Sequence, residues 1–120
     1  MEKKIKLIGY TKNPYPYLRN AQIFILSSKF EGSPNVLVEA LFFRKYIIST
    51  DCPTGPKEIL ANGKYGDLVK IGDYKKIAQL IRAYSKKKSQ KINSMNIAHL
   101  NKFNYKRNCK EYLNLISNFL

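Results

Sequence analysis

Apolar positions in the first 72 residues fall into short runs separated by turn residues. The runs Gln22–Leu26 and Tyr46–Thr50 are mostly apolar, which is typical of parallel strands covered on both faces. Two shorter runs, Ile5–Gly9 and Asp67–Ile71, predict further strands. Helical patterns stand between them, and strands that alternate with helices predict an α/β fold. The sequence therefore predicts a parallel sheet of about four strands with flanking helices.

Three helices are predicted within this part of the chain. They cover Tyr17–Ala21, a segment from Pro34 to about Phe43, and a short turn around Lys57–Ala61. Ser33 is suited to cap the second helix, and Pro34 to its first position, where a missing N–H costs nothing. Asn13–Pro16 is predicted as a loop, because proline fits neither a strand ladder nor a helix interior.

The pattern becomes purely helical from Asp73 onward. Apolar residues recur at i, i+3, i+4 and i+7, which predicts an amphipathic helix that faces a core; they are Ile77, Leu80, Ile81 and Tyr84. The last segment repeats the pattern at Cys109, Tyr112, Leu113, Ile116 and Leu120. We expect one domain over 1–120, with a sheet-containing part over 5–72 and a helical part over 73–120.

Composition narrows the class of protein. The apolar fraction is 44%, with nine tyrosines and six phenylalanines, as in globular chains and unlike disordered ones. No apolar run approaches the roughly 18 residues of a membrane-spanning helix, and the first residues do not form a signal peptide. Cys52 and Cys109 lie far apart without a metal-binding spacing, so we expect free thiols in a reducing cytosol.

The net charge of +14 is the strongest compositional signal. Residues 61–120 carry 13 Lys and Arg against 3 Asp and Glu, or +10, whereas residues 1–60 carry 9 against 5, or +4. Such a surplus favours anionic partners, although a solvated, lysine-rich surface without a specific partner explains it as well. The run Lys86–Lys88 is subject to the same two interpretations, solvent exposure or an anionic membrane surface.

One stretch has the character of a site. Gly32-Ser33-Pro34-Asn35 is a turn that follows a buried strand and leads directly into a helix, whose free N–H groups attract anions. Glu39 lies within that otherwise apolar helix, and a carboxylate there is costly unless it has a partner. The partner is either a Lys or Arg side chain or a ligand. Glu31, in the loop, would alone be interpreted as solvated.

Together these residues resemble a known family. Glu31 and Glu39 form an E-x7-E motif within SSKFEGSPNVLVEAL, followed by YIISTDCPTGPKEIL and NGKYGDLVKIGD. These segments resemble the retaining glycosyltransferases of family 4, which adopt the GT-B fold. The resemblance covers about residues 5–82 closely and continues loosely into the last helix. It implies a partial Rossmann-like domain, namely the C-terminal, donor-binding part of such an enzyme.

The resemblance also implies roles for individual residues. Glu31 takes the catalytic position and contacts hydroxyls of the donor sugar, while Glu39 binds the ribose diol. A carboxylate suits a diol because it accepts two hydroxyl hydrogen bonds. The diphosphate falls to backbone N–H groups, which stabilise the leaving group; they belong to Gly32, Ser33, Asn35 and Val36. The base is expected near Tyr10, Thr11 and Lys12. No metal or other cofactor is expected.

The implied reaction is sugar transfer from a nucleotide sugar, UDP-linked, to a cell-surface glycan or lipid-linked acceptor. Polysaccharide and lipopolysaccharide synthesis in a bacterial cytoplasm, at the inner face of the membrane, fits this class. The acceptor domain and first donor-domain units of the family have no counterpart here, so we expect an N-terminal domain or second chain as partner and no transfer by this chain alone. We also expect Ile5–Gly9 to pair with Gln22–Leu26, or another chain to cover that edge.

Several alternatives remain open from the residues. A glycosidase could use Glu31 and Glu39 as its carboxylate pair, but nothing predicts a substrate cleft. A basic nucleic-acid or anion-binding module would show salt-dependent binding that is indifferent to Glu39→Ala; no nucleic-acid motif is present, and no such partner is expected. An assembly piece that completes a partner chain is a third possibility. His99 falls on an apolar stripe with Ile92 and Met95, so a packing role is expected.

Overall fold

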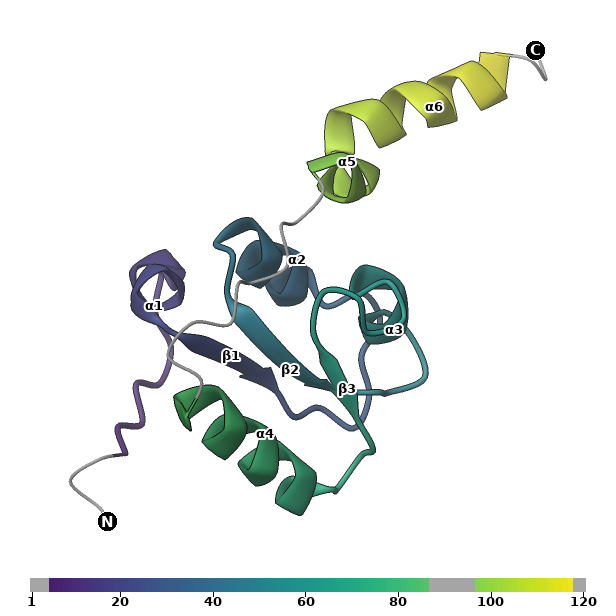
Figure 1. Cartoon of the computed structure of the whole chain (residues 1–120). Helices are drawn as coiled ribbons and strands as arrows, with labels where there is room; N and C mark the ends of the chain where they lie inside the picture. The colour runs from purple at the N-terminus through teal and green to yellow at the C-terminus, as the bar shows by residue number, and fades with distance from the viewer. Residues whose placement is uncertain (1–4, 87–96, 118–120) are drawn as a thin grey trace.

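The computed structural model describes residues 5–86 and 97–117. Its centre is a three-stranded parallel sheet in the order β1-β2-β3 (Figure 1). The strands are β1 (Ile23–Leu26), β2 (Tyr46–Thr50) and β3 (Asp67–Val69), with Phe24 opposite Ile47 and Ser49 opposite Leu68. The predicted α/β class with a parallel sheet is confirmed.

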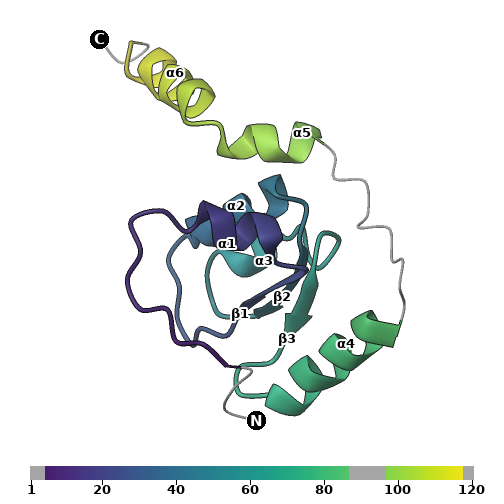
Figure 2. The same ribbon diagram turned by 90° about the vertical axis from the view of Figure 1, so that its left-hand side faces the viewer.

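Helices cover both faces of this sheet. Three lie on one face and one on the other (Figures 1 and 2): α1 (Tyr15–Asn20), α2 (Asn35–Phe42) and α3 (Pro56–Ile59), opposed by α4 (Tyr74–Lys86). The main core lies beneath the group of three and is formed by Leu18, Leu37, Ala40, Leu41, Ile47, Ile59 and Leu60. Because α2 and α3 contribute most of these side chains, the core fixes the two loops that lead into them.

The helix on the other face is held by an aromatic contact. Tyr84 of α4 stacks on Tyr46 with ring centroids 4.7 Å apart, and the Tyr46 hydroxyl donates a hydrogen bond to Asp67. Burial, together with that carboxylate, raises the pKa of Tyr46 well above its ordinary value. At the start of α4, Asp73 Oδ1 accepts from the Lys76 N–H at 2.9 Å. The predicted apolar stripe of α4 is half-buried, and Lys86 at its end is exposed; Lys87 and Lys88 lie outside the described residues.

The segment Ile5–Gly9 does not form the strand that its sequence predicts. Residues 5–10 are exposed, and within the described residues β1 pairs with β2 alone. Direct pairing of Ile5–Gly9 with β1 is therefore wrong. An apolar run becomes a strand only where a neighbouring strand accepts its backbone hydrogen bonds. No such neighbour stands beside residues 5–9 in the described part of the chain, and the outer edge of β1 has no strand partner there.

Two helix starts also differ from prediction. α1 begins at Tyr15 and includes Pro16, which is tolerated because the first helical turn needs no backbone donor. The start of α2 has Pro34 as its N-cap residue, and no side chain caps it. Ser33 therefore does not act as the cap, and the helix begins one residue later than expected.

The C-terminal part is joined to the body through His99. It consists of α5 (Ile97–Leu100), η2 (Asn101–Phe103) and α6 (Tyr105–Ser117). His99 Nε2 donates to the Ile59 carbonyl oxygen at 2.7 Å, and the ring packs between Tyr65 and Phe103. The predicted packing role is confirmed, although Ile92 and Met95 lie outside the described residues.

The last helix does not face a core. No residue of α6 is buried, and both views show it projecting away from the α/β body (Figures 1 and 2). The expectation that its apolar stripe packs inward is wrong for this chain, because no described element lies opposite the stripe. Leu120 lies outside the described residues.

Candidate functional site

The loops that follow β1 and β2 are joined at the carboxyl edge of the sheet. The Thr50 hydroxyl donates to the Ser28 carbonyl oxygen at 2.5 Å, and the Thr54 hydroxyl donates to the Glu31 carbonyl oxygen. Thr50 ends β2, and Ser28 lies two residues beyond β1, so the contact between adjacent strands continues into the loops. This edge of a parallel α/β sheet is where such folds bind ligands.

Gly55 allows the two loops to approach closely. Its φ is +92°, and a Cβ at this position would lie 2.5 Å from Pro34 Cδ and 3.0 Å from the Gly32 carbonyl oxygen. Neither the proline ring nor the backbone can yield easily. A residue without a side chain is therefore required where the second loop crosses the turn before α2.

The side chain of Glu31 is held in place by its own loop. Ser28 Oγ donates to Glu31 Oε1 at 2.5 Å, and the residue is half-buried. The second carboxylate oxygen, Oε2, has no protein partner among the described residues. One oxygen thus orients the carboxylate, and the other is available to a ligand.

The start of α2 presents unpaired donors. Pro34 has no N–H, and the first hydrogen bond of the turn runs from the Leu37 N–H to the Pro34 carbonyl oxygen at 2.9 Å. In the described part of the chain, no side chain caps this helix and no acceptor faces the N–H groups of Asn35 or Val36. Such donors, at the positive end of the helix dipole, favour an anion.

Glu39 lies one turn further along the same helix, four residues after Asn35 and therefore on the same side. It is half-buried. Over residues 5–86 and 97–117 no Lys or Arg forms an ion pair with it, so the alternative of a structural salt bridge is not realised. Its carboxylate is thus partly withdrawn from water without a fixed partner, and it follows the anion-attracting helix start by one turn.

A cavity of about 630 Å³ adjoins this edge. It lies between the loop at Gly32, the turn at Thr54 and Gly55, and the C-terminal residues His99 and Lys102. Lys57 and Glu58 of α3 also line it, so its charged lining consists of two lysines and one glutamate. Of the predicted site residues only Gly32 lines the cavity; Ser33, Asn35, Val36 and both glutamates do not.

Sequence reasoning missed Lys57 and Lys102. They are 45 residues apart in the chain, and only the contact of α5 with α3 brings them to one cavity. In the sequence, Lys57 belongs to a segment that resembles the family, but no separate feature marks it as a site residue. For Lys102, no local pattern separates it from the other lysines of the C-terminal half.

The three residues predicted to lie near the base do not belong to the loops that follow β1 and β2. Tyr10, Thr11 and Lys12 belong to the segment before α1, which Figure 1 shows at the left, whereas the strands run toward the right. Tyr10 is exposed, and the Thr11 hydroxyl bonds only within its own turn, to the Asn13 carbonyl oxygen. In the described residues no hydrogen bond or ion pair joins them to the loop at Glu31, and their role at the base stays a prediction.

Other functional features are few in the described residues. Cys52 is buried and Cys109 exposed, and both are free thiols, as expected from the sequence. Within residues 5–86 and 97–117, no three His, Cys, Asp or Glu side chains gather in a way that could hold a metal ion. None of the described helices combines the length and apolar character that crossing a membrane requires.

The fold and this edge define a partial Rossmann-like domain of the GT-B type, in which half-buried carboxylates lie on either side of an uncapped helix start. The chain belongs to the family described as glycosyl transferases group 1, whose sequence model matches residues 1–87. This confirms the broader part of what the E-x7-E segment implied, a glycosyltransferase of the GT-B type.

Individual relatives are consistent with this assignment. The chain is 40% identical over 83 residues to an uncharacterized glycosyltransferase of Methanocaldococcus jannaschii, covering 58% of this chain and 20% of the relative. It is 35% identical over 71 residues to the N-acetylgalactosamine-N,N'-diacetylbacillosaminyl-diphospho-undecaprenol 4-alpha-N-acetylgalactosaminyltransferase of Campylobacter jejuni, covering 59% and 20%. It is 30% identical over 76 residues to the lipopolysaccharide 1,6-galactosyltransferase of Salmonella typhimurium, covering 60% and 21%. The chain thus spans about one fifth of the length of the curated relatives it matches.

Proposed function

We propose that this chain is the donor-binding part of a retaining, metal-independent glycosyltransferase of family 4. The donor is a nucleotide sugar linked to UDP, and the acceptor is a cell-surface glycan or a lipid-linked glycan. The reaction takes place in the cytoplasm, at the inner face of the membrane. The 120 residues bind the donor, and transfer requires an acceptor domain and further donor-domain units, supplied by additional polypeptide.

The observation that carries this proposal is the start of α2, which lies between two half-buried carboxylates. Within the described residues no side chain caps this helix and neither carboxylate forms an ion pair. In this proposal the donor diphosphate accepts hydrogen bonds from the N–H groups of Gly32, Ser33, Asn35 and Val36. Fixed donors in such a place stabilise the charge that grows on the leaving diphosphate. Lys57 and Lys102 line the adjoining cavity together with Glu58, so two cations against one carboxylate leave a net positive charge there.

The two carboxylates would bind the sugars on either side of the diphosphate. Glu31, oriented by Ser28, directs Oε2 to hydroxyls of the transferred sugar. Glu39 accepts hydrogen bonds from both hydroxyls of the ribose, and a charged acceptor makes each bond stronger than a neutral one. This division assigns a separate ligand group to each glutamate, so the two are separable by experiment.

The relatives support the choice of acceptor. The Campylobacter jejuni relative is named for an undecaprenol-linked diphosphate substrate and the Salmonella typhimurium relative for lipopolysaccharide. On this basis we propose a glycan or lipid-linked acceptor for this chain as well. The outer edge of β1 has no strand partner in the described residues. This edge also supports the proposal that additional polypeptide supplies the further donor-domain units.

Calorimetric titration of the purified chain with UDP and with 2′-deoxy-UDP tests the role of Glu39. A hydrogen bond to a charged group contributes about 1.5–3 kcal/mol, or about 10- to 150-fold in Kd. We expect UDP to bind more tightly than 2′-deoxy-UDP by a factor in that range. Glu39→Gln should weaken UDP binding and reduce the discrimination between the two ligands, while the matched change Glu111→Gln, on α6, should leave both unchanged.

Two outcomes would overturn the proposal. One is the absence of UDP binding by the unmodified chain at ligand concentrations up to the millimolar range. The other is binding whose preference for UDP over 2′-deoxy-UDP persists in Glu39→Gln. Sugar transfer from a UDP-sugar by the 120-residue chain alone would overturn only the requirement for additional polypeptide.

A further inference from the structure

The Thr54 hydroxyl makes the last hydrogen bond that holds the loop after β1 before α2 begins. It belongs to the loop after β2 and donates to the Glu31 carbonyl oxygen. The next backbone hydrogen bond of the segment runs from the Leu37 N–H to the Pro34 carbonyl oxygen. Among the described residues no hydrogen bond involves the backbone of Gly32, so its orientation depends on the contact that precedes it.

Gly32 has no side chain that could fix its own orientation. A Cβ at this position would meet nothing within 4 Å, and the residue is exposed. Glycine populates positive and negative φ about equally, so the peptide units beside it rotate readily. Without the Thr54 hydroxyl, the peptide unit between Glu31 and Gly32 would have no hydrogen bond in the described part of the chain that selects one orientation.

This peptide unit transmits the contact at Thr54 to the Gly32 N–H. A trans peptide is planar, and its C=O and N–H groups point in opposite directions. Because the Glu31 carbonyl oxygen faces the Thr54 hydroxyl, the Gly32 N–H points away from it. This N–H has no acceptor within residues 5–86 and 97–117. Gly32 thus presents a donor whose direction is fixed and whose partner is not a described residue.

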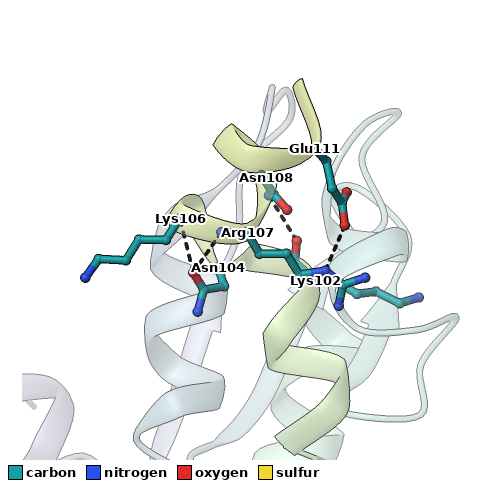
Figure 3. Close-up of polar contacts among 6 residues, drawn as sticks. All are labelled: Lys102, Asn104, Lys106, Arg107, Asn108 and Glu111. Carbon is teal, nitrogen blue, oxygen red and sulfur yellow. Dashed lines mark hydrogen bonds and ion pairs between the residues drawn. The ribbon is translucent and has the colours of Figure 1, made fainter. Parts of the chain in front are cut away.

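The start of α6 shows how the chain satisfies such donors where a side chain is available. Asn104 Oδ1 accepts from the N–H groups of Lys106 and Arg107 at 3.1 and 3.3 Å (Figure 3). At α2 the capping position is taken by Pro34, which makes no such hydrogen bond. The donors before α2 are therefore left to a ligand, and their affinity for it depends on how well they are oriented beforehand.

We propose that Thr54 is a positioning residue for the donor diphosphate and acts through the peptide unit between Glu31 and Gly32. Its hydroxyl holds the Gly32 N–H in the orientation that donates to the β-phosphate, the phosphate that bears the sugar. The β-phosphate is chosen because Gly32 follows Glu31, which the proposed function assigns to the sugar, whereas Glu39 is assigned to the ribose. This inference rests on the proposed function and adds a residue that acts through another.

A positioning role differs measurably from a contact that only tightens the fold. Loosening of the two loops as a whole would weaken every ligand of the site alike. Misorientation of the Gly32 N–H weakens only a ligand that carries the β-phosphate. UMP and UDP differ by this phosphate alone, so the ratio of their dissociation constants measures what the β-phosphate contributes.

Calorimetric titration of the full 120-residue chain with UMP and with UDP tests the proposal. Thr54→Val removes the hydroxyl and keeps the shape of the side chain. It should weaken UDP binding about tenfold, the lower end for a hydrogen bond to a charged group, and UMP binding by less than about twofold. Thr54→Ser keeps a hydroxyl and should restore most of the UDP affinity. Because Thr54 is exposed, far-UV circular dichroism should show both variants folded.

Ser85→Ala supplies the matched control. Ser85 Oγ donates to the Arg82 carbonyl oxygen at 2.9 Å on α4, so this variant loses the same kind of hydrogen bond on the other face of the sheet. It should bind UMP and UDP as the unmodified chain does. Proton–nitrogen NMR adds a direct signal, because the Gly32 amide proton should move downfield further with UDP than with UMP. That difference should disappear in Thr54→Val.

Each adverse result points to a different error. If UDP binds but Thr54→Val leaves the ratio of UMP to UDP dissociation constants unchanged, the positioning role is wrong and the donor assignment stands. Equal weakening of both ligands, or a Thr54→Ser variant as weak as Thr54→Val, would also refute a role of the hydroxyl at the β-phosphate. If the unmodified chain does not bind UDP, the proposed function fails and this inference fails with it.

Discussion

Replacement of Gly55 by alanine tests the close approach of the two loops on which the candidate site depends. The change adds one methyl group at a position with φ of +92°, 2.5 Å from Pro34 Cδ and 3.0 Å from the Gly32 carbonyl oxygen. Two costs follow, the strain of an L-residue at a positive φ and the steric overlap with a proline ring and a backbone oxygen.

Each cost has a magnitude. An unfavourable backbone conformation costs about 1–3 kcal/mol, and overpacking of a tight site about 1–3 kcal/mol. Gly55→Ala should therefore lower the free energy of unfolding by about 2–6 kcal/mol, against a total of about 5–15 kcal/mol for a domain. The chain has no tryptophan but nine tyrosines, so urea unfolding can be followed by far-UV circular dichroism together with tyrosine fluorescence.

Gly72 supplies the control. Its φ is +83°, but a Cβ there would meet nothing within 4 Å, so Gly72→Ala carries only the backbone cost. The difference between the two variants isolates the overlap at Pro34. We expect Gly55→Ala to be the more destabilising by about 1–3 kcal/mol and also to weaken UDP binding. If the two variants are equally stable, the loops do not approach as described and this reasoning is wrong.

Two further predictions concern contacts outside the proposed donor site. Burial and the Asp67 carboxylate raise the pKa of Tyr46 in the folded state. The contribution of the Tyr46 hydroxyl to stability is therefore fully present below about pH 10 and is lost as the pH rises above that value. Tyr46→Phe should reduce this loss of stability at alkaline pH, as measured by urea titrations at a series of pH values. His99→Ala removes the hydrogen bond to Ile59 and the packing of the ring on Tyr65. Amide hydrogen exchange should therefore accelerate in residues 97–117 while the exchange of β2 is unchanged. Acceleration throughout the sheet would contradict the view that His99 holds only the C-terminal part.

The sequence alone determined the elements whose signal is local. The strand Tyr46–Thr50 was predicted with its observed bounds, because five mostly apolar, β-branched-rich residues between turns fit little else. The periodicity at Ile77 to Tyr84 predicted α4. The turn before Asn35 and Glu39 stood out in the sequence as a candidate site, since an acid within an apolar helix is costly on any fold. The sequence did not reveal that Ser33 leaves the helix start uncapped, or whether Glu39 has a cationic partner.

Tertiary structure decided what depends on a neighbour. Ile5–Gly9 has the composition of a strand, but no strand of the described residues lies beside it to accept its hydrogen bonds. Strand formation requires such a partner, which no local pattern reveals. The stripe of α6 has the same spacing as that of α4, yet only α4 meets a sheet, because periodicity specifies a face and not what covers it. Likewise Lys102 reaches the cavity only because His99 docks α5 on α3. Contacts between residues far apart in the chain depend on loop closure and packing, which short-range patterns do not encode.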